Sequence, residues 1–266
     1  FPNVHSIFKS LGAKIFPAPV DEGGMLVDEI PESIKPKLIH VTPSNHYPTG
    51  AVLSPERRRK LLEYASQSGT FIIENDYDHE ISNFQTPQPS LFELDTEGRV
   101  IFLGTFNRLL HPSVRLGYMV LPIRLLDAVK SLQKHSHRFV SPSGQVVLSE
   151  FIRKDFIFKH IQNVFNVYVE RDAIFQRLLG DYLPEFRIHK SAAPSLHLLV
   201  KMPATFEDKH FAEYLKNNGV LTHAYSNTFI ENPQMGLIFG HISLRRHLME
   251  AKIMAMANAY REFIGD

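Results

Sequence analysis

Hydrophobic residues in the first half of the chain fall into short, continuous runs that predict β-strands. The runs are rich in Val, Ile, Leu and Phe and are bounded by Gly, Pro or polar residues. They cover residues 37–41, 70–74, 99–103 and 116–121. Since hydrophobic and polar positions do not alternate within them, we expect a sheet that is buried on both faces.

A helical pattern separates the first two predicted strands. Ser54 can cap a helix, Pro55 suits its first position, and an apolar stripe ends before Gly69. Strands that alternate with helices of this length imply a largely parallel α/β sheet, in which ligands bind beyond the carboxyl ends of the strands. The polar clusters after each strand are therefore the places to look for a site.

The second half of the chain has a different pattern. Helical spacing predicts one long helix over residues 145–179 that joins two domains. A strand pair, a helix, an apolar segment and a final helix then predict a small α+β domain, at residues 186–190, 195–201, 206–217, 236–242 and 244–263. We therefore expect a large domain over residues 1–153 and an interdomain helix with a small domain over residues 154–266.

Composition narrows the class of protein. With 266 residues and 44% hydrophobic content, the chain can bury a sizeable core. Lys and Arg total 29 against 28 Asp and Glu, so the net charge of +1 lacks the basic character of a nucleic-acid-binding protein. Any DNA contact would need a separate module. The absence of cysteine excludes disulfides, thiolate metal sites and a cysteine nucleophile.

No apolar run approaches the ~18 residues that a membrane helix requires, so we expect a soluble, cytoplasmic protein without membrane contacts. The chain opens at Phe1 and not at a methionine. We therefore expect it to be a piece of a longer polypeptide.

Three polar segments at predicted strand ends carry the candidate chemistry. Residues 41–50 run from a strand into a Pro-Thr-Gly turn, and residues 72–78 bring an acidic and aromatic cluster to the end of a buried strand. Residues 104–118 follow a strand with small and hydroxyl side chains, and contain Arg108 and Arg115, seven positions apart. Taken alone, the second segment could equally be a capped loop with solvated acids.

In this order and spacing, the three segments resemble the pyridoxal phosphate region of MocR/GabR-type transcriptional regulators of the GntR family. Residues 72–78 are similar to that family's Glu-Asp-Asp-Tyr-Asp strand end, and residues 104–118 to its Gly-Thr-Phe-Ser-Lys segment followed by Arg-Leu-Gly-Tyr. The resemblance implies an α/β fold of the fold-type I, PLP-dependent transferase-like kind, with a mostly parallel sheet in the large domain and a small α+β C-terminal domain.

The resemblance also implies partners and site residues. It implies a homodimer, a small-molecule effector, and DNA binding only through an N-terminal domain that this chain does not contain. Tyr77 would hydrogen-bond the phenolic oxygen of the cofactor and Arg115 would hold its phosphate. Thr105 and Asn107 lie where donors at a strand-to-helix turn can assist phosphate binding. The alternative for Arg115 is a solvent-facing ion pair.

Two positions depart from the family pattern. Arg108 occupies the position of the Schiff-base lysine, and a guanidinium that remains protonated cannot act as an amine nucleophile. Asn75 occupies the position of the aspartate that keeps the pyridine nitrogen protonated, and an amide lacks that negative charge. We therefore predict no catalytic residue, and pyridoxal phosphate that is noncovalent if it binds at all.

These departures favour an aminotransferase-like, ligand-binding domain of a transcriptional regulator with impaired catalysis. A PLP-dependent class I/II aminotransferase and a purely structural dimerisation module are the alternatives.

Other charged groups receive simpler interpretations. We predict no metal site, because neither His135 with His137 nor His241 with His247 forms a ligand set with carboxylates. His79 and His111 are candidates for ligand contact near the cleft. The basic run at Arg57, Arg58, Arg59 and Lys60 is interpreted as a solvated helix face.

Overall fold

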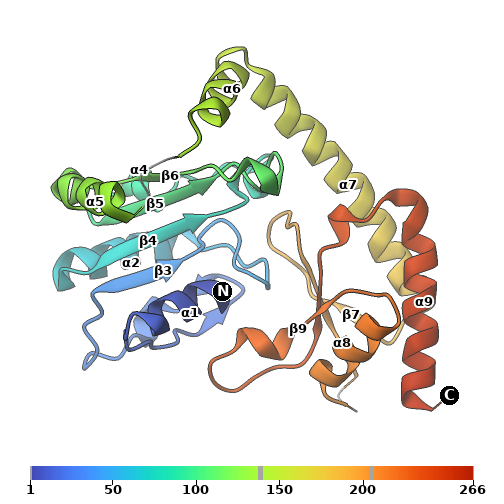
Figure 1. Cartoon of the computed structure of the whole chain (residues 1–266). Helices are drawn as coiled ribbons and strands as arrows, with labels where there is room; N and C mark the ends of the chain where they lie inside the picture. Colours follow the sequence, from blue (N-terminus) through green and yellow to red (C-terminus); the bar gives the residue numbers. More distant parts are fainter. Residues whose placement is uncertain (1, 137–139, 204–205, 266) are drawn as a thin grey trace.

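The computed structural model describes residues 2–136, 140–203 and 206–265. A first four-stranded sheet has the order β3-β4-β5-β6 (Figure 1). β3, β4 and β5 are parallel, and β6 runs antiparallel to β5. This sheet confirms the predicted strands and the mostly parallel α/β class, with bounds β3 (Leu38–Val41), β4 (Phe71–Asp76), β5 (Val100–Thr105) and β6 (Gly117–Val120).

Helices and short turns surround the first sheet. The predicted helix is α2, in which the Ser54 hydroxyl accepts a hydrogen bond from Arg57 N, Pro55 opens the helix, and Gly69 ends it in the left-handed conformation. The elements are α1 (Pro2–Ser10), β1 (Val20–Asp21), β2 (Gly24–Met25), η1 (Val27–Glu29), α2 (Pro55–Ser68), α3 (His79–Ser82), α4 (Leu91–Leu94), η2 (Pro112–Val114) and α5 (Ile123–Ser136).

The expectation of a sheet buried on both faces is wrong at its β6 edge. Burial alternates along β4, and all four residues of β6 are exposed. Tyr118 of β6 lies against Gly104 of β5, where an added Cβ would stand 2.2 Å from Tyr118 Cζ. A continuous apolar run therefore does not guarantee cover on both faces, because cover depends on what packs over the strand.

The predicted single long helix is two helices, α6 (Pro142–Arg153) and α7 (Phe156–Tyr182). Asp155 between them has φ 56°, in the left-handed region that interrupts an α-helix. The apolar spacing continues across the break, so periodicity alone did not reveal it. α7 runs from α6 to the small domain, as expected for a connecting helix (Figure 1).

A second, antiparallel sheet has the order β7-β8-β10-β9 and confirms the small α+β unit. Its core is rich in aromatic rings, among them Phe186, Phe211 and Tyr260. The domain boundary after residue 153 stays a prediction. The elements are β7 (Arg187–Ile188), β8 (Leu198–Lys201), α8 (Asp208–Asn217), β9 (His223–Ala224), η3 (Tyr225–Thr228), β10 (Leu237–Phe239), η4 (His241–Ser243) and α9 (Arg246–Ile264).

The loop after β3 contacts the segment before β8, which connects the first sheet to the small α+β unit. Ser191 Oγ and Ala192 N both donate to Gly50 O, at 3.2 and 3.1 Å. Gly50 has φ 69°, and an added Cβ would lie 1.8 Å from Ser191 Oγ, so only glycine fits this close approach. Among the described helices, none has both the length and the apolar character needed to cross a membrane.

Candidate functional site

Three loops follow the carboxyl ends of the parallel strands, as the topology requires. β3 continues into residues 42–50, β4 into residues 77–78, and β5 into residues 106–116. The small domain contributes the residues that precede β8. Polar side chains from all these segments meet at the end of the first sheet.

Tyr77 lies in a cluster of rings from both domains. The ring centroid of His197 lies 4.8 Å from that of Tyr47 and 6.4 Å from that of Tyr77, with both pairs edge to face. Tyr77 Oη and His197 Nδ1 are buried and have no hydrogen-bond partner among the described residues. Buried polar atoms are usually paired, so these two atoms are available to a ligand.

Arg108 places a positive charge beside this ring cluster. Burial raises the pKa of Tyr77, Asp78 raises it further, and Arg108 opposes both. Burial also lowers the pKa of His197 to about 4, and Arg108 acts in the same direction. The Arg108 side chain is exposed, and within the described ranges it forms no hydrogen bond or ion pair. It can therefore attract an anion that approaches these rings.

Asp78 and Asn45 form a buried pair next to the rings. Asn45 Nδ2 donates to Asp78 Oδ2 at 2.6 Å. Burial raises the pKa of Asp78 well above its usual range, and the neighbouring Asp76 adds to this effect. The remaining side-chain oxygens of both residues lack partners within the described part of the chain.

Asn75 points to a different neighbour. Its Nδ2 lies 3.2 Å from Nε2 of His40, which stands on the adjacent strand β3. Burial lowers the pKa of His40 to about 4, so this imidazole is neutral near pH 7. The contact is therefore between two uncharged groups.

The predicted phosphate residues shape the loop between β5 and β6. Asn107 N donates to Thr105 Oγ1 at 3.2 Å, and Asn107 Oδ1 accepts from Leu116 N at 3.2 Å. Arg115 is exposed and has φ 48°, a left-handed conformation that is uncommon outside glycine. It has no hydrogen-bond or ion-pair partner among the described residues, so its guanidinium remains available to an anion. His111 Nδ1 contacts Ser113 Oγ at 2.7 Å in the same loop.

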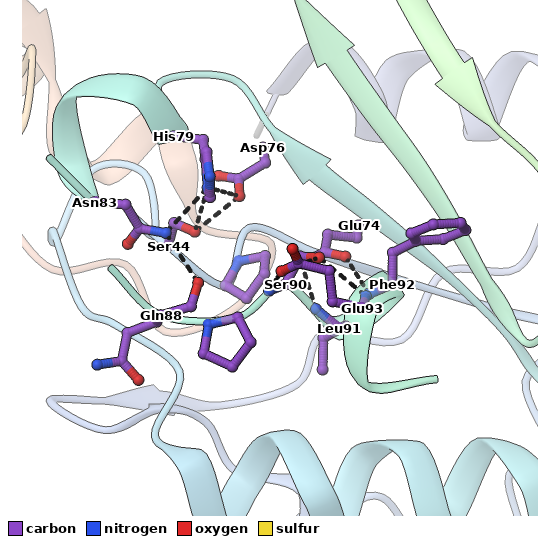
Figure 2. A network of polar contacts seen from close by, with 12 residues as sticks. Ser44, Glu74, Asp76, His79, Asn83, Gln88, Ser90, Leu91, Phe92 and Glu93 are labelled. Carbon is purple, nitrogen blue, oxygen red and sulfur yellow. Dashed lines mark hydrogen bonds and ion pairs between the residues drawn. The ribbon is translucent and has the colours of Figure 1, made fainter. Parts of the chain in front are cut away.

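The other side of β4 holds a closed hydrogen-bond network (Figure 2). Asp76 Oδ2 lies 2.8 Å from both Ser44 Oγ and His79 Nδ1, and Asn83 Nδ2 lies 3.1 Å from the same His79 atom. The hydrogen bond to Asp76 raises the pKa of His79, while burial opposes the rise. His79, predicted near the cleft, is thus engaged by Asp76.

Glu74 also faces this network and caps helix α4. Its two carboxylate oxygens accept from Leu91 N and Phe92 N, each at 2.9 Å (Figure 2). Burial raises the pKa of Glu74 to about 7, although the two backbone donors lower it. Both carboxylate oxygens of Glu74 therefore hold the start of helix α4 in place.

The interpretation of the basic run as a solvated face is wrong for Arg58, which is 1% exposed. Its guanidinium donates to three backbone carbonyls, those of Leu53, Pro89 and Pro43. Arg57 pairs with Asp21 across a short ion pair. One side of α2 faces the interior, so successive basic residues on this helix have opposite environments.

The structure brings Tyr77 and Arg108 together, and adds side chains that sequence reasoning missed: Asn45, Tyr47, His40, Asp78 and His197. Most of these lie in the polar segments at strand ends, so their position was a usable indication. His197 belongs to the other domain, and only the tertiary contact identifies it. Among the described residues, no group of three or more His, Asp or Glu could hold a metal ion; His137 lies outside those residues.

Comparisons with known proteins identify the family of this chain. A model of the family "Aminotransferase class I and II" matches residues 1–228. The HTH-type transcriptional regulator YdeL of Bacillus subtilis is 35% identical over 237 residues, covering 88% of this chain and 50% of that protein. MocR of Rhizobium meliloti is 31% identical over 253 residues, covering 94% of this chain and 51% of that protein. The chain thus spans about half the length of these curated relatives.

The fold agrees with that of solved aminotransferases. The multiple substrate aminotransferase of Thermococcus profundus superposes with a TM-score of 0.88 at 21% identity, covering 100% of this chain and 68% of that chain. At this identity the likeness concerns the fold alone. Together these comparisons confirm the predicted resemblance and the fold-type I architecture.

Proposed function

Because the chain belongs to the class I and II aminotransferase family, we propose that it is the ligand-binding, aminotransferase-like part of a MocR/GabR-type transcriptional regulator, and that its covalent chemistry is impaired. The proposal rests on Arg108, which the resemblance places at the position of the Schiff-base lysine. A guanidinium offers no free amine to a carbonyl. The same arginine adds positive charge beside the buried, unpaired hydroxyl of Tyr77.

The cleft residues fit a pyridoxal phosphate that is held without a covalent bond. Tyr77 Oη is buried and unpaired among the described residues, which suits a ligand oxygen. Arg115 is free to pair with a phosphate, because no described residue engages its guanidinium. When joined to an enzyme lysine, pyridoxal phosphate supplies an electron sink. Here the chain supplies binding and orientation only.

Asn75 supports the loss of catalysis independently of Arg108. A carboxamide can hydrogen-bond a ring nitrogen, but it has no charge to hold a proton there. Its contact with neutral His40 adds none. We infer that this site has kept ligand binding and has lost transamination activity.

The partners follow from the same proposal. The effector is a small molecule in the cleft, and the assembly is a homodimer. DNA contact would fall to a part of the full-length protein outside this chain, whose own net charge is +1. The HTH-type name of YdeL, whose matched region is half of that protein, supports this division. Sedimentation showing only monomer at micromolar concentration would contradict the dimer.

The alternative function is that of a PLP-dependent aminotransferase. It is favoured by the family match over residues 1–228 and by the shared fold. Because residue 108 is an arginine, this function requires a lysine at another position to react with the cofactor at this site. Treatment with borohydride, followed by peptide mapping, would locate such a lysine and would overturn the proposed loss of covalent chemistry.

Calorimetric titration of pyridoxal phosphate into the full-length protein tests the proposal. Arg115→Ala should weaken binding roughly 10- to 100-fold, because an arginine–phosphate contact is a strong charge-assisted pair. Arg177→Ala on α7, 67% exposed at its side chain, is the matched control and should bind like wild type. Equal affinity for wild type and Arg115→Ala, or no binding by either, would contradict the proposal.

Arg108→Lys sharpens this test. If the old cofactor site is otherwise sound, this variant should gain a visible absorption band that maps to residue 108 after borohydride reduction. Wild type should show no adduct in the cleft. Mapping is essential because surface lysines react nonspecifically.

A further inference from the structure

Strand β6 is an edge of the first sheet that lacks the usual protection of an exposed edge. In the order β3-β4-β5-β6 it pairs only with β5 among the described strands. Exposed edge strands commonly carry a charged residue or a proline, which prevents pairing with a further strand. β6 has the sequence Gly-Tyr-Met-Val and contains neither. Its edge is therefore open to another β-strand.

The backbone geometry shows which groups this edge offers. Phe106 N donates to Leu116 O at 3.0 Å, next to the ladder between β5 and β6. Hydrogen-bonded pairs alternate along an antiparallel ladder, so Tyr118, two residues after Leu116, also bonds to β5. Gly117 and Met119 then direct their N–H and C=O groups away from β5. These four groups can pair with one more strand.

Two helices near β6 are also uncovered. No described residue of α5 or α6 is buried. Both helices nevertheless carry large apolar side chains, of which Ile123 is 90% exposed, Leu132 66% and Val147 71%. Helices of globular proteins bury an apolar stripe against a neighbour, and an extended apolar surface marks a contact with another part of a protein. Both helices lie toward the β6 edge of the sheet, away from β3 (Figure 1).

We propose that the part of the full-length polypeptide outside this chain covers the face formed by β6, α5 and α6. That part adds a β-strand to β6 through Gly117 and Met119, and it packs apolar side chains against both helices. The amount of missing fold supports this occupant, because the solved aminotransferase of Thermococcus profundus superposes on 100% of this chain, which covers only 68% of that chain. A strand and two helices that bury no residue are typical of a core surface whose covering layer lies elsewhere. This inference does not depend on the ligand of the proposed function.

Photo-cross-linking in the full-length protein identifies what covers β6. Met119→p-benzoylphenylalanine should cross-link to a peptide outside residues 1–266, in a product that keeps the mass of one polypeptide on a denaturing gel. The same replacement at Leu221, in the small domain and 71% exposed, is the matched control and should not capture that peptide. A product of doubled mass would identify a second copy as the occupant and overturn the inference. An uncross-linked chain would indicate an open face and would also overturn it.

Hydrogen exchange of the full-length protein, read at single residues by mass spectrometry, tests the backbone pairing. The amide of Met119 should exchange about as slowly as that of Tyr118, because both are then hydrogen-bonded within a sheet. At an uncovered edge, the Met119 amide would exchange more than about ten-fold faster than the Tyr118 amide. Such a difference would overturn the added strand.

Two substitutions at equally exposed residues test the cover over the helices. Val147 and Leu221 are each 71% exposed, but only Val147 lies on the proposed covered face. In the full-length protein, Val147→Glu places an unpaired charge in an apolar contact, so the melting temperature should fall by about 5 °C or more. Leu221→Glu should change it by less than about 2 °C. Equal shifts in the two variants would overturn the cover on α6.

Discussion

Buried polar groups on and near strand β4 fall into two classes, those with hydrogen-bond partners in the protein and those without. On the network side, both oxygens of Glu74 accept backbone hydrogen bonds, and Asp76 is paired with Ser44 and His79. Just beyond the carboxyl end of the strand, Tyr77 Oη and Asp78 Oδ1 have no partner within the described residues. The same strand thus joins a satisfied hydrogen-bond network to buried polar atoms that lack a partner among the described residues.

The difference separates groups that stabilise the fold from groups that we propose to bind a ligand. Removing one partner from a satisfied network exposes the full desolvation cost of the other. Removing a group that has no partner in the protein has little such cost. Stability measurements and binding measurements should therefore respond to different residues.

The largest expected effect is on the network side, at Arg58. Arg58→Ala leaves three backbone carbonyls without their donor, so the free energy of unfolding should fall by about 3 kcal/mol or more. Arg59→Ala is the matched control in the same helix, because Arg59 is 62% exposed and pairs only with Glu63 among the described residues. It should change stability by less than about 0.5 kcal/mol. Urea unfolding measures both, and similar losses in the two variants would contradict the assignment.

The next effect is a pH dependence at Glu74. Burial raises the pKa of this carboxyl from 4.5 to about 7 in the folded protein. The folded state therefore binds more protons than the unfolded state between these values, so the contribution of Glu74 is present below 4.5 and is lost as pH rises through 7. Relative to Glu74→Gln, wild type should lose up to about 3 kcal/mol across this window.

Urea unfolding at several pH values between about 4.5 and 8 measures this difference. Subtracting the curve of the Gln variant removes the contributions of the other titrating groups. A constant difference between the two proteins would show that the buried carboxyl has an ordinary pKa, and that the two backbone donors offset its desolvation.

The smallest expected effect on stability is at Tyr77. At this residue a substitution should change ligand affinity without changing the free energy of unfolding. Tyr77→Phe removes an unpaired hydroxyl, so unfolding without ligand should change by less than about 0.5 kcal/mol. Affinity for pyridoxal phosphate should fall about two- to ten-fold. Tyr64→Phe is the opposite control, because Tyr64 Oη donates to Ile34 O at 3.2 Å. It should lose about 1 kcal/mol of stability and keep its affinity. The same response from both variants would remove the distinction.

Much of the fold was predictable because local patterns carry it. The four strands of the first sheet and helix α2 lie within a few residues of their expected bounds, and Ser54, Pro55 and Gly69 mark the helix ends as their chemistry requires. The break at Asp155 was not predictable, because a single left-handed residue leaves the apolar spacing unchanged.

The candidate site was predictable only in part. Tyr77, Arg108 and Arg115 were found because they stand at fixed positions in segments after strands. Their assigned roles toward a cofactor stay predictions. Arg58 was misjudged because its neighbours in sequence are solvent-facing, and only helix packing shows which member of a basic run is buried.

By itself the sequence determined the α/β class and the strand ends that carry polar groups, since these depend on residue type and short-range spacing. That Arg108 stands in place of an amine stays a prediction. Only the tertiary structure decided that His40 engages Asn75 and that His197 joins Tyr77. Those contacts join segments distant along the chain. Which side-chain atoms are paired and which remain open depends on that packing, and the open atoms are the ones that a ligand can use.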